Sequence, residues 1–365
     1  MTDSSVGHAP YHPTGYKMIR SADIKEFKCF EHANLKDCRT INVIVGRNAS
    51  GKTALLEAMF LALGASPEVV LRLKKWRGYD SAPRGTSEEI DKSIWRDLFN
   101  GFDLSKVVNI NLEGTDTHAR QLKIRYREQG DLLTSPEFGN ATVVYNSPVI
   151  FEYKRPKSPE KKVTVQFVDG QYHWRGVDTV LSQAAFFASG YPFPQHENID
   201  RFSKISKARH AEELVEAISN EFGFVKGVEI LSNSGEPMLH VDTPWYEEKI
   251  PLSAISSGVS KLVYLLIAII AMPKSVLFID EIENGFYYDR FPSLWGTLHR
   301  LCKAHDVQIF ASTHSWECLE AMKNALADHP NDVSFIRSTM EAGKATVEQY
   351  HGSTFFPAID VGEVR

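Results

Sequence analysis

The fold is decided by the stretch Gly46-Arg47-Asn48-Ala49-Ser50-Gly51-Lys52-Thr53, or GRNASGKT. Its order of glycine, four residues and then Gly-Lys-Thr is the pattern of a phosphate-binding loop. Glycines let the main chain turn sharply and come close, so that backbone N–H groups can wrap a phosphate chain. Lys52 is expected to contact the β- and γ-phosphates, and the Thr53 hydroxyl to bind Mg²⁺. We therefore predict that all eight residues line a nucleotide site.

The residues on either side of this loop have the patterns of a strand and a helix. The run Ile41 to Val45 is apolar and rich in β-branched residues, as in a strand buried on both faces. Ala54 to Leu63 has the character of a helix, and Gly64 ends it. Because strand, loop and helix follow in this order, the positive end of the helix dipole is expected to face the phosphates.

Composition narrows the class of protein. The chain has 365 residues, which favours two domains or one domain with a long insertion. Its 41 Lys and Arg against 46 Asp and Glu give a net charge of -5, so nothing in the overall charge points to nucleic acid or membrane. The four cysteines lack metal-ligand spacing, which indicates reduced thiols in a cytoplasmic protein.

Neither a membrane segment nor a signal peptide is expected. The most apolar stretch, Leu262 to Met272, is shorter than the ~20 residues of a membrane span and is predicted to be a buried helix. Residues 1–16 mix Ser, His, Pro and Gly without a basic or apolar region, so we predict a flexible tail.

Residues 78–250 are predicted to form a β-rich and then helical insertion between two halves of an α/β core. A polar loop is expected from Gly78 to Glu88, and a hairpin turn at Asp169-Gly170. Helical spacing begins near Glu197, and a second hairpin turns at Asn233-Ser234-Gly235. Strands are predicted at 107–112, 122–126, 141–145, 149–153, 163–168, 171–174, 228–231 and 238–241.

A second apolar strand pattern, Ser275 to Ile279, ends in Asp280-Glu281. A carboxylate at the end of such a strand is where phosphate-loop enzymes hold Mg²⁺, usually through water. Glu281, one residue further on, can point to the opposite side and polarise an attacking water. Taken alone, the pattern is better explained by solvated acids at the end of a strand. Its position downstream of a complete phosphate loop favours the catalytic interpretation.

Two further patterns complete the candidate site. Val307 to Ser312 predicts a third buried strand, which leads to His314, a residue able to donate a hydrogen bond to the γ-phosphate. Ser256, Ser257 and Gly258 precede the apolar helix, and small residues at a helix N-terminus can form a second anion-binding cradle. An ordinary helix entry is the alternative for this string. Two cradles in one chain suggest that they share a nucleotide.

Taken together, GRNASGKT, ISSGVSK, VLFIDEIENG and FASTHS stand in the order of the ABC-type ATPase head. The chain resembles the soluble branch that includes RecF, SMC and OLD proteins, and the OLD-like AAA ATPases most of all. The stretches that carry this likeness are IDEIENGF at 279–286, QIFASTHS at 308–315 and Glu363-Val364-Arg365. The resemblance runs from about Met18 to the end of the chain.

The resemblance implies an α/β P-loop NTPase fold of the ABC-ATPase head type. A mixed or parallel central sheet, an antiparallel β subdomain and a helical subdomain are expected. Lys52 and Thr53 would bind phosphate and Mg²⁺, Asp280 would hold the metal, Glu281 would be the general base and His314 the switch histidine. Ser256 and Gly258 would contact ATP held by a second subunit, which implies a head-to-tail ATP-sandwich dimer.

The sequence departs from the family pattern at three places. The signature is Ser256-Ser257-Gly258-Val259 and not LSGGQ, and Tyr287-Tyr288 stands where relatives carry a histidine-containing segment. The glutamine of the Q-loop has three candidates, Gln121, Gln166 and Gln171.

Three functions remain open at this stage. OLD enzymes carry a TOPRIM nuclease domain after the ATPase, and none is visible before Arg365, so the leading hypothesis is an ATPase that senses or scaffolds for a separate effector such as a nuclease. Similar proteins do this in bacterial anti-phage systems. The second is a RecF-like clamp on DNA, with candidate contacts in Lys74-Lys75-Trp76-Arg77 and at Lys154-Arg155 with Lys161-Lys162. The third, a transporter subunit, is disfavoured by the variant signature.

Overall fold

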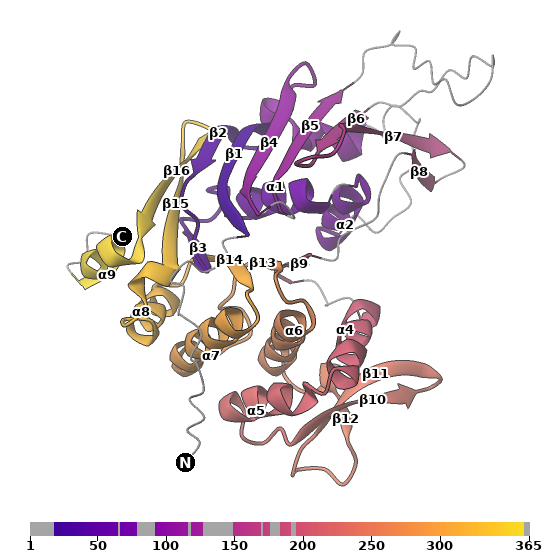
Figure 1. Cartoon of the computed structure of the whole chain (residues 1–365), viewed down its shortest axis with the longest axis vertical. Coiled ribbons are helices and arrows are strands. Elements are labelled where there is room, and N and C mark those ends of the chain that lie inside the picture. The colour runs from indigo at the N-terminus through magenta and orange to yellow at the C-terminus, as the bar shows by residue number, and fades with distance from the viewer. Residues whose placement is uncertain are drawn as a thin grey trace, which may run out of the picture.

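The chain is described here by a computed structural model that covers residues 18–64, 66–78, 92–115, 118–126, 149–168, 171–175, 183–190 and 195–360. Two β-sheets, one mainly parallel and one antiparallel, are stacked with helix α1 (Lys52–Gly64) between them, and further helices cover the outer face of the parallel sheet (Figure 1). Four predicted features lie outside the described residues: the tail at 1–16, most of the loop at 78–88, the strand at 141–145 and the C-terminal Glu363-Val364-Arg365.

The central sheet has six strands in the order β16-β15-β3-β14-β13-β9. All neighbours are parallel except the edge pair β15 and β16. The strands are β3 (Ile41–Val45), β9 (Ala184–Phe187), β13 (Val276–Ile279), β14 (Gln308–Thr313), β15 (Val333–Glu341) and β16 (Lys344–His351). The three strands predicted around the phosphate loop are β3, β14 and β13, side by side, which confirms their prediction.

The continuous apolar character of these strands follows from their position between two hydrophobic cores. Along β3, Ile41 and Val43 belong to the core under the outer helices, whereas Ile44 belongs to the core around α1. Strand β13 alternates in the same way, with Leu277 facing the first core and Phe278 the second. A strand with both faces covered has no solvent side for polar residues, so its sequence reads as one apolar run.

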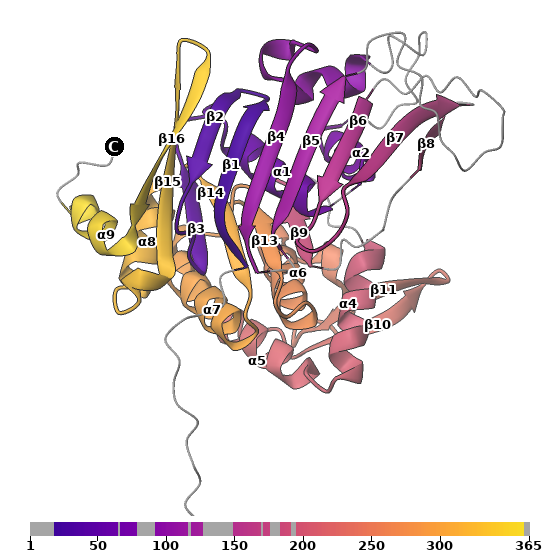
Figure 2. The ribbon, with the colours of Figure 1, turned by 45° about the horizontal axis from the view of Figure 1, so that its top comes forward.

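The second sheet is antiparallel and has seven strands in the order β2-β1-β4-β5-β6-β7-β8 (Figure 2). The turn predicted at Asp169-Gly170 lies outside the described residues, but β7 and β8 pair with Val168 opposite Gln171, which confirms the hairpin. The strands are β1 (Ile19–Phe27), β2 (Phe30–Leu35), β4 (Val107–Gly114), β5 (Arg120–Tyr126), β6 (Val149–Lys154), β7 (Lys161–Val168) and β8 (Gln171–Arg175).

The division of the strands between the two sheets does not follow the predicted boundary of the insertion. Strands β1 and β2 precede the phosphate loop in sequence, yet they join the antiparallel sheet. Strand β9 lies within residues 78–250, yet it pairs with β13 in the parallel sheet. Each sheet therefore contains strands from both sides of residue 78. The boundaries of the insertion at residues 78 and 250 stay a prediction.

A glutamine joins the two sheets at the amino end of β14. The Gln308 side chain accepts a hydrogen bond from the Ile19 N–H at 2.8 Å and donates to the main-chain oxygens of Ile19 and Arg39, at 2.9 Å each. The side chain is buried, so all three bonds are shielded from water. The start of β1 is thereby fixed to the start of β14.

Helices complete the fold on both sides of the parallel sheet. The apolar helix predicted from Leu262 is α6 (Ser257–Ala271), which is buried along nearly its whole length. Helix α6 lies beside α7 (Phe291–Ala304) and near α4 and α5 (Figure 1). The hairpin of β10 and β11 turns at Ser234-Gly235, as predicted. The other elements are α2 (Glu68–Trp76), α4 (Gln195–Lys207), α5 (Ala211–Glu221), α8 (Trp316–Ala325), α9 (Gly352–Asp360), β10 (Gly227–Asn233), β11 (Glu236–Asp242) and β12 (Ile250–Pro251), with 3₁₀ turns at Arg96–Leu98, Asn100–Phe102, Leu252–Ala254, Tyr288–Arg290 and Pro330–Asp332.

Candidate nucleotide-binding site

The phosphate loop lies between the end of β3 and the start of α1, and two of its glycines could not carry a side chain. Gly46 has φ +150°, and a Cβ there would lie 2.2 Å from the Ser338 carbonyl oxygen. Gly51 has φ +99°, and a Cβ there would lie 2.8 Å from Cys29 Sγ. Both glycines are therefore required by close contacts with neighbouring strands and turns as well as by their backbone angles.

Lys52 closes this loop with its side chain. Its ammonium group donates to the main-chain oxygens of Gly46, at 2.7 Å, and Arg47, at 3.0 Å. The side chain is buried, and burial lowers the pKa of Lys52, although Asp280 and Glu281 oppose this shift. A cation is thus held at the mouth of the loop, at the position where the sequence predicts contact with phosphate.

Thr53 and Asp280 meet at the ends of α1 and β13. The Thr53 hydroxyl donates to the Asp280 carboxylate, with oxygens at 3.1 and 3.0 Å, and the Ser312 hydroxyl donates to the same carboxylate at 2.5 Å. Burial raises the pKa of Asp280, while the hydrogen bonds from Ser312 and Thr53 act to lower it. The structure therefore brings together the two residues that the sequence assigned to Mg²⁺.

Glu281 directly follows Asp280, and both residues line the same cavity. Its backbone has φ +49°, and its N–H donates to Ser312 Oγ at 2.8 Å. The carboxylate accepts hydrogen bonds from the Ser189 hydroxyl and from Asn284 Nδ2, the latter at 2.5 Å. Burial alone would raise the pKa of Glu281, but these two hydrogen bonds, with the nearby charge of His314, bring it below its ordinary value. An ionised, oriented carboxylate results.

His314 lies between two carboxylates. Its Nδ1 is 3.0 Å from Glu283 Oε1 and 4.0 Å from Glu281 Oε1, and its backbone N–H donates to the same Glu283 oxygen at 2.8 Å. Its side chain is 45% exposed, whereas that of Glu283 is 8% exposed. Glu283 therefore orients the histidine from the protein side and leaves the ring accessible.

The signature residues Ser256 and Ser257 do not line this cavity. Ser256 caps α6, since its hydroxyl accepts a hydrogen bond from the Val259 N–H, and both serines are exposed. Gly258 is buried against the turn after Glu281, where a Cβ would lie 2.1 Å from the Gly285 oxygen. Within the described residues, the helix predicted as a second cradle is therefore outside the cavity formed by the same chain's phosphate loop.

Lys261 connects the signature helix to Glu281. It belongs to the quoted stretch ISSGVSK, but no role was predicted for it from the sequence. Its buried ammonium group donates to the main-chain oxygens of Glu281, Ile282 and Asn284 at 2.7 to 3.2 Å. Burial lowers its pKa to about 8, against the raising effect of Glu283 and Asp280. The position of Lys261, five residues after the cap Ser256, gave no local signal for this contact, because the acceptor oxygens come from another segment.

The nucleotide cavity has a volume of about 450 Å³ and includes two basic residues that the sequence analysis did not assign to the nucleotide site. Lys28 follows β1 and Arg77 follows α2, and both pair with the buried Glu57 of α1; the Arg77 pair measures 2.8 Å. Arg77 is 41% exposed and lines the cavity beside the loop. A carboxylate on α1 thus holds two cations where a phosphate chain would lie.

Other candidate residues lie elsewhere. Gln121, one of the Q-loop candidates, lies on the wall of a different cavity with Arg20 and Lys154, and the side chains of Gln166 and Gln171 are outside the described residues. None of the helices in the described part of the chain has the length and apolar character needed to span a membrane. None of the four cysteines, all of which lie in the described residues, forms a disulfide there.

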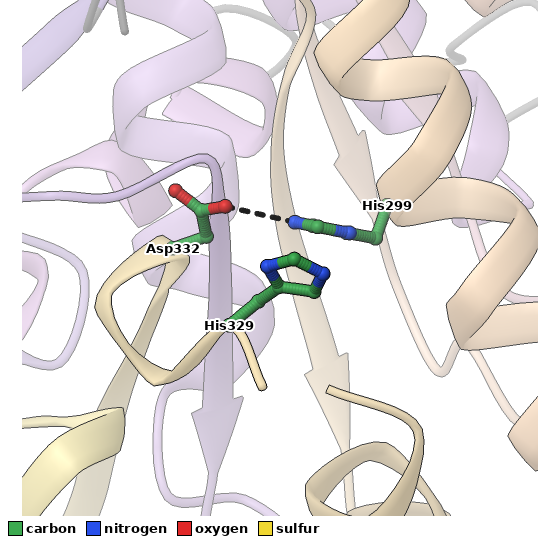
Figure 3. Close-up of side chains that lie close together, drawn as sticks. All are labelled: His299, His329 and Asp332. Carbon is green, nitrogen blue, oxygen red and sulfur yellow. Dashed lines mark hydrogen bonds and ion pairs between the residues drawn. The ribbon is translucent and has the colours of Figure 1, made fainter. Parts of the chain in front are cut away.

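One other group of metal-type ligands occurs in the described ranges. His299, His329 and Asp332 lie together between α7 and the turn before β15 (Figure 3). Asp332 already accepts hydrogen bonds from His299 Nε2 at 2.9 Å and Lys303 Nζ at 3.2 Å, one on each oxygen. The contact with His299 lowers the pKa of Asp332. These bonds satisfy the carboxylate without a metal, so we assign the group a structural role in fixing this turn to α7.

Comparisons with known proteins agree with this geometry. A family model described as "AAA domain" matches residues 22–177, and one described as "AAA domain, putative AbiEii toxin, Type IV TA system" matches residues 182–320. An "ATP/GTP phosphatase" of Helicobacter pylori is 24% identical over 336 residues, which cover 85% of this chain and 89% of that protein. These matches support an AAA-type P-loop ATPase.

Two SMC proteins are also similar to this chain, one in its fold and one over a short stretch of sequence. A solved SMC head bound to the C-terminal winged-helix domain of ScpA matches with a TM-score of 0.50 at 16% identity, over 93% of this chain and 99% of that one. The structural maintenance of chromosomes protein 6 of Saccharomyces cerevisiae is 43% identical over 53 residues, only 14% of this chain and 5% of that protein. The chain has the SMC and ABC head fold, which confirms the predicted fold class.

Proposed function

We propose that this protein is a Mg²⁺-dependent ATPase of the OLD-like type, which binds ATP between two copies of the chain. The observation that carries the proposal is that the catalytic groups of one chain converge on the phosphate loop, while its signature serines are exposed and directed elsewhere. The ATP-binding residues are those of the loop, residues 46–53, with Ser256, Ser257 and Gly258 supplied by the partner.

The residues present fit a magnesium ion. Thr53 offers a hydroxyl and Asp280 a buried carboxylate, and hydroxyl and carboxylate oxygens are the donors that Mg²⁺ takes together with phosphates. Their mutual hydrogen bonds keep both groups facing the loop. When bound, Mg²⁺ neutralises charge on the β- and γ-phosphates. Ser312, which bonds to Asp280, would keep the carboxylate in place.

The remaining side chains support hydrolysis. Lys52 and the loop N–H groups hold the phosphates, and Arg77 adds a charge from the cavity wall. Glu281, with its lowered pKa, accepts a proton from the attacking water, and Ser189 and Asn284 orient it. His314 is within reach of the same carboxylate and donates to the γ-phosphate as the switch residue.

The role of the ATPase is to pass a nucleotide-dependent state to a separate effector protein. The arrangement around Lys261 supports this, because the turn that follows the catalytic Glu281 is bonded to the signature helix, whose first serines are exposed. ATP bound between two copies would therefore change the surface around Tyr287 and Tyr288, which are 67% and 60% exposed. We propose cytoplasmic anti-phage defence as the setting and a nuclease as the effector, a setting in keeping with the toxin-type family description of residues 182–320.

A RecF-like role on DNA has less support at its first candidate segment. Lys74 pairs with Asp97 at 2.6 Å, Arg77 pairs with Glu57, and Trp76 stacks on Phe186. These basic and aromatic side chains are engaged within the protein. The second candidate, Lys154 with Arg155, lies in a separate basic cavity whose ligand is considered below.

Mixing two inactive variants tests the composite site. Lys52→Ala disables the phosphate loop, and Ser257→Arg places a bulky charge on the exposed signature face. In a head-to-tail dimer, a mixture restores one intact site in each mixed pair, so we expect about a quarter of wild-type ATP turnover from two inactive proteins. Ser253→Arg, an exposed serine before the signature, is the matched control and should remain active. Absence of recovery in the mixture would contradict the composite site.

A further inference from the structure

A second cavity with a strongly basic lining lies at the ends of β4, β5 and β6. It has a volume of about 410 Å³ and is open to solvent beside the antiparallel sheet. Glu113 is its one acidic lining residue among those described, and that carboxylate already pairs with Arg20 at 3.4 Å and accepts from Ser21 at 2.9 Å. The basic residues on its wall are Arg20, Arg120, Lys154, Arg155 and Lys157.

Arg120 is the unusual member of this group. It is 6% exposed, and it points to the same side of β5 as the core residues Leu122 and Ile124. Its one hydrogen bond within the described chain joins a terminal nitrogen to the main-chain oxygen of Ala119 at 2.8 Å, and its Nε is buried without an acceptor. Burial and the neighbouring Arg155 lower its pKa to about 10.

A buried guanidinium without a carboxylate is costly, because it has lost its hydration and gained no countercharge. The cost is higher here because a second arginine faces it. An anion in the cavity would satisfy both, since guanidinium groups bind phosphate oxygens through paired, charge-assisted hydrogen bonds. A phosphate chain carries more negative charge than a sulfate-like or carboxylate ligand, so it would pair with more of the five basic side chains on the cavity wall.

We propose that this basic cavity binds phosphate groups, with Arg120 and Arg155 as the contacts that hold them. Lys154 and Arg20 lie at the rim and attract the anion by charge. The site does not depend on the proposed ATPase cycle, because it uses none of the residues that line the nucleotide cavity.

The two phosphate sites lie at opposite ends of the sheet. Arg20 follows Ile19, which is bonded to Gln308 at the amino end of β14, whereas Ser312 and the phosphate loop lie at the carboxyl end. At a rise of ~3.3 Å per residue, the ends of this six-residue strand are roughly 17 Å apart. One phosphate chain cannot occupy both sites in one copy, so binding at the basic cavity can be measured with the nucleotide site disabled.

The first test uses inorganic pyrophosphate on the full chain carrying Lys52→Ala, with melting temperature as the readout. Adding Arg120→Leu should raise the melting temperature without ligand by about 2 °C or more, because an uncompensated buried charge is removed. It should also abolish the rise that pyrophosphate gives. Arg155→Gln should weaken pyrophosphate binding about tenfold or more. Lys123→Leu, at an exposed position of the same strand, should change neither result.

The second test distinguishes the source of the phosphate with a short fluorescein-labelled DNA duplex. If the ligand is a nucleic-acid backbone, the Arg155→Gln variant should bind the duplex about tenfold more weakly. The salt dependence of its affinity for the duplex should also fall by about one phosphate contact. Arginine-dependent binding of pyrophosphate alone identifies a free phosphate compound. The proposal is overturned if neither probe distinguishes Arg120→Leu and Arg155→Gln from Lys123→Leu, or if Arg120→Leu only lowers stability and leaves both affinities unchanged.

Discussion

The phosphate loop and the signature helix carry the two predicted halves of one nucleotide site, yet the protein treats them differently. Around the loop, three charged groups have partners: Lys52 bonds to loop oxygens, Asp280 to Thr53 and Ser312, and Glu281 to Ser189 and Asn284. At the signature helix, Ser256 and Ser257 face solvent, and Ser256 uses its hydroxyl only to cap the helix.

This difference agrees with our proposal that the residues of the loop are organised within one chain, whereas the signature serines act on the nucleotide of a second chain. Where a site is complete in one copy, its polar groups are already oriented by neighbours, as in the loop. Where polar groups remain exposed on a rigid, buried helix, a partner can be bound without rearrangement of the core. Three predictions test this contrast, in order of expected effect.

Glu281→Gln is expected to give the largest change. Removing the proton acceptor should lower the turnover number about 10²- to 10⁴-fold while ATP binding is kept, because the amide preserves the shape of the side chain. Single-turnover hydrolysis with radiolabelled ATP measures this, and equilibrium binding of the same nucleotide checks affinity. Asp289→Asn, an exposed acid on the following turn, is the control. A Glu281→Gln variant that hydrolyses ATP at the wild-type rate would disprove the assignment of the base.

Lys52→Ala should affect the loop side alone. Loss of the ammonium group removes a charge-assisted contact, and we expect ATP affinity to fall about 100-fold by titration calorimetry. The signature helix is untouched, so the variant should still supply it to a partner. Lys75→Ala, at an exposed position of α2, should bind ATP normally. Equal affinities in Lys52→Ala and wild type would place the nucleotide elsewhere.

Lys261→Met should break the connection between the two sides. The variant leaves the main-chain oxygens of Glu281, Ile282 and Asn284 without their shared donor, which should cost roughly 1–3 kcal/mol of unfolding free energy. ATP binding at the loop should persist, while hydrolysis should fall because Glu281 is less well oriented. Urea unfolding and turnover measured on one preparation check both. An unchanged midpoint together with unchanged turnover would show that the contact has no role.

The local parts of the site could be predicted from the sequence, and the parts formed by distant segments could not. The loop, Asp280-Glu281 and His314 each follow a strand whose apolar run is visible in the sequence. Ser189 and Arg77 gave no such sign, because their roles depend on where β9 and α2 pack. Strand β9 itself has only four residues, and its pairing with β13 spans about ninety positions.

The fold shows the same limit. The apolar periodicity predicted β3, β13 and β14 of the parallel sheet and most strands of the middle region, but it did not predict β9, β15 or β16. It did not predict that β1 and β2 join that region, since the partner of β1 lies beyond the phosphate loop in sequence. Pairing order depends on side-chain packing across the sheet, which no window of the sequence contains.

Strand β14 carries a polar residue near each end, and these two residues connect parts of the protein that lie far apart. Gln308 fixes one end to the antiparallel sheet, and Ser312 fixes the other end to the Asp280 carboxylate and to the backbone of Glu281. A buried strand of this length is stiff, so the two sheets and the two acids, Asp280 and Glu281, should open and close as one cooperative unit. Amide hydrogen exchange should therefore protect the starts of β1 and β14 and the end of β13 to the same degree.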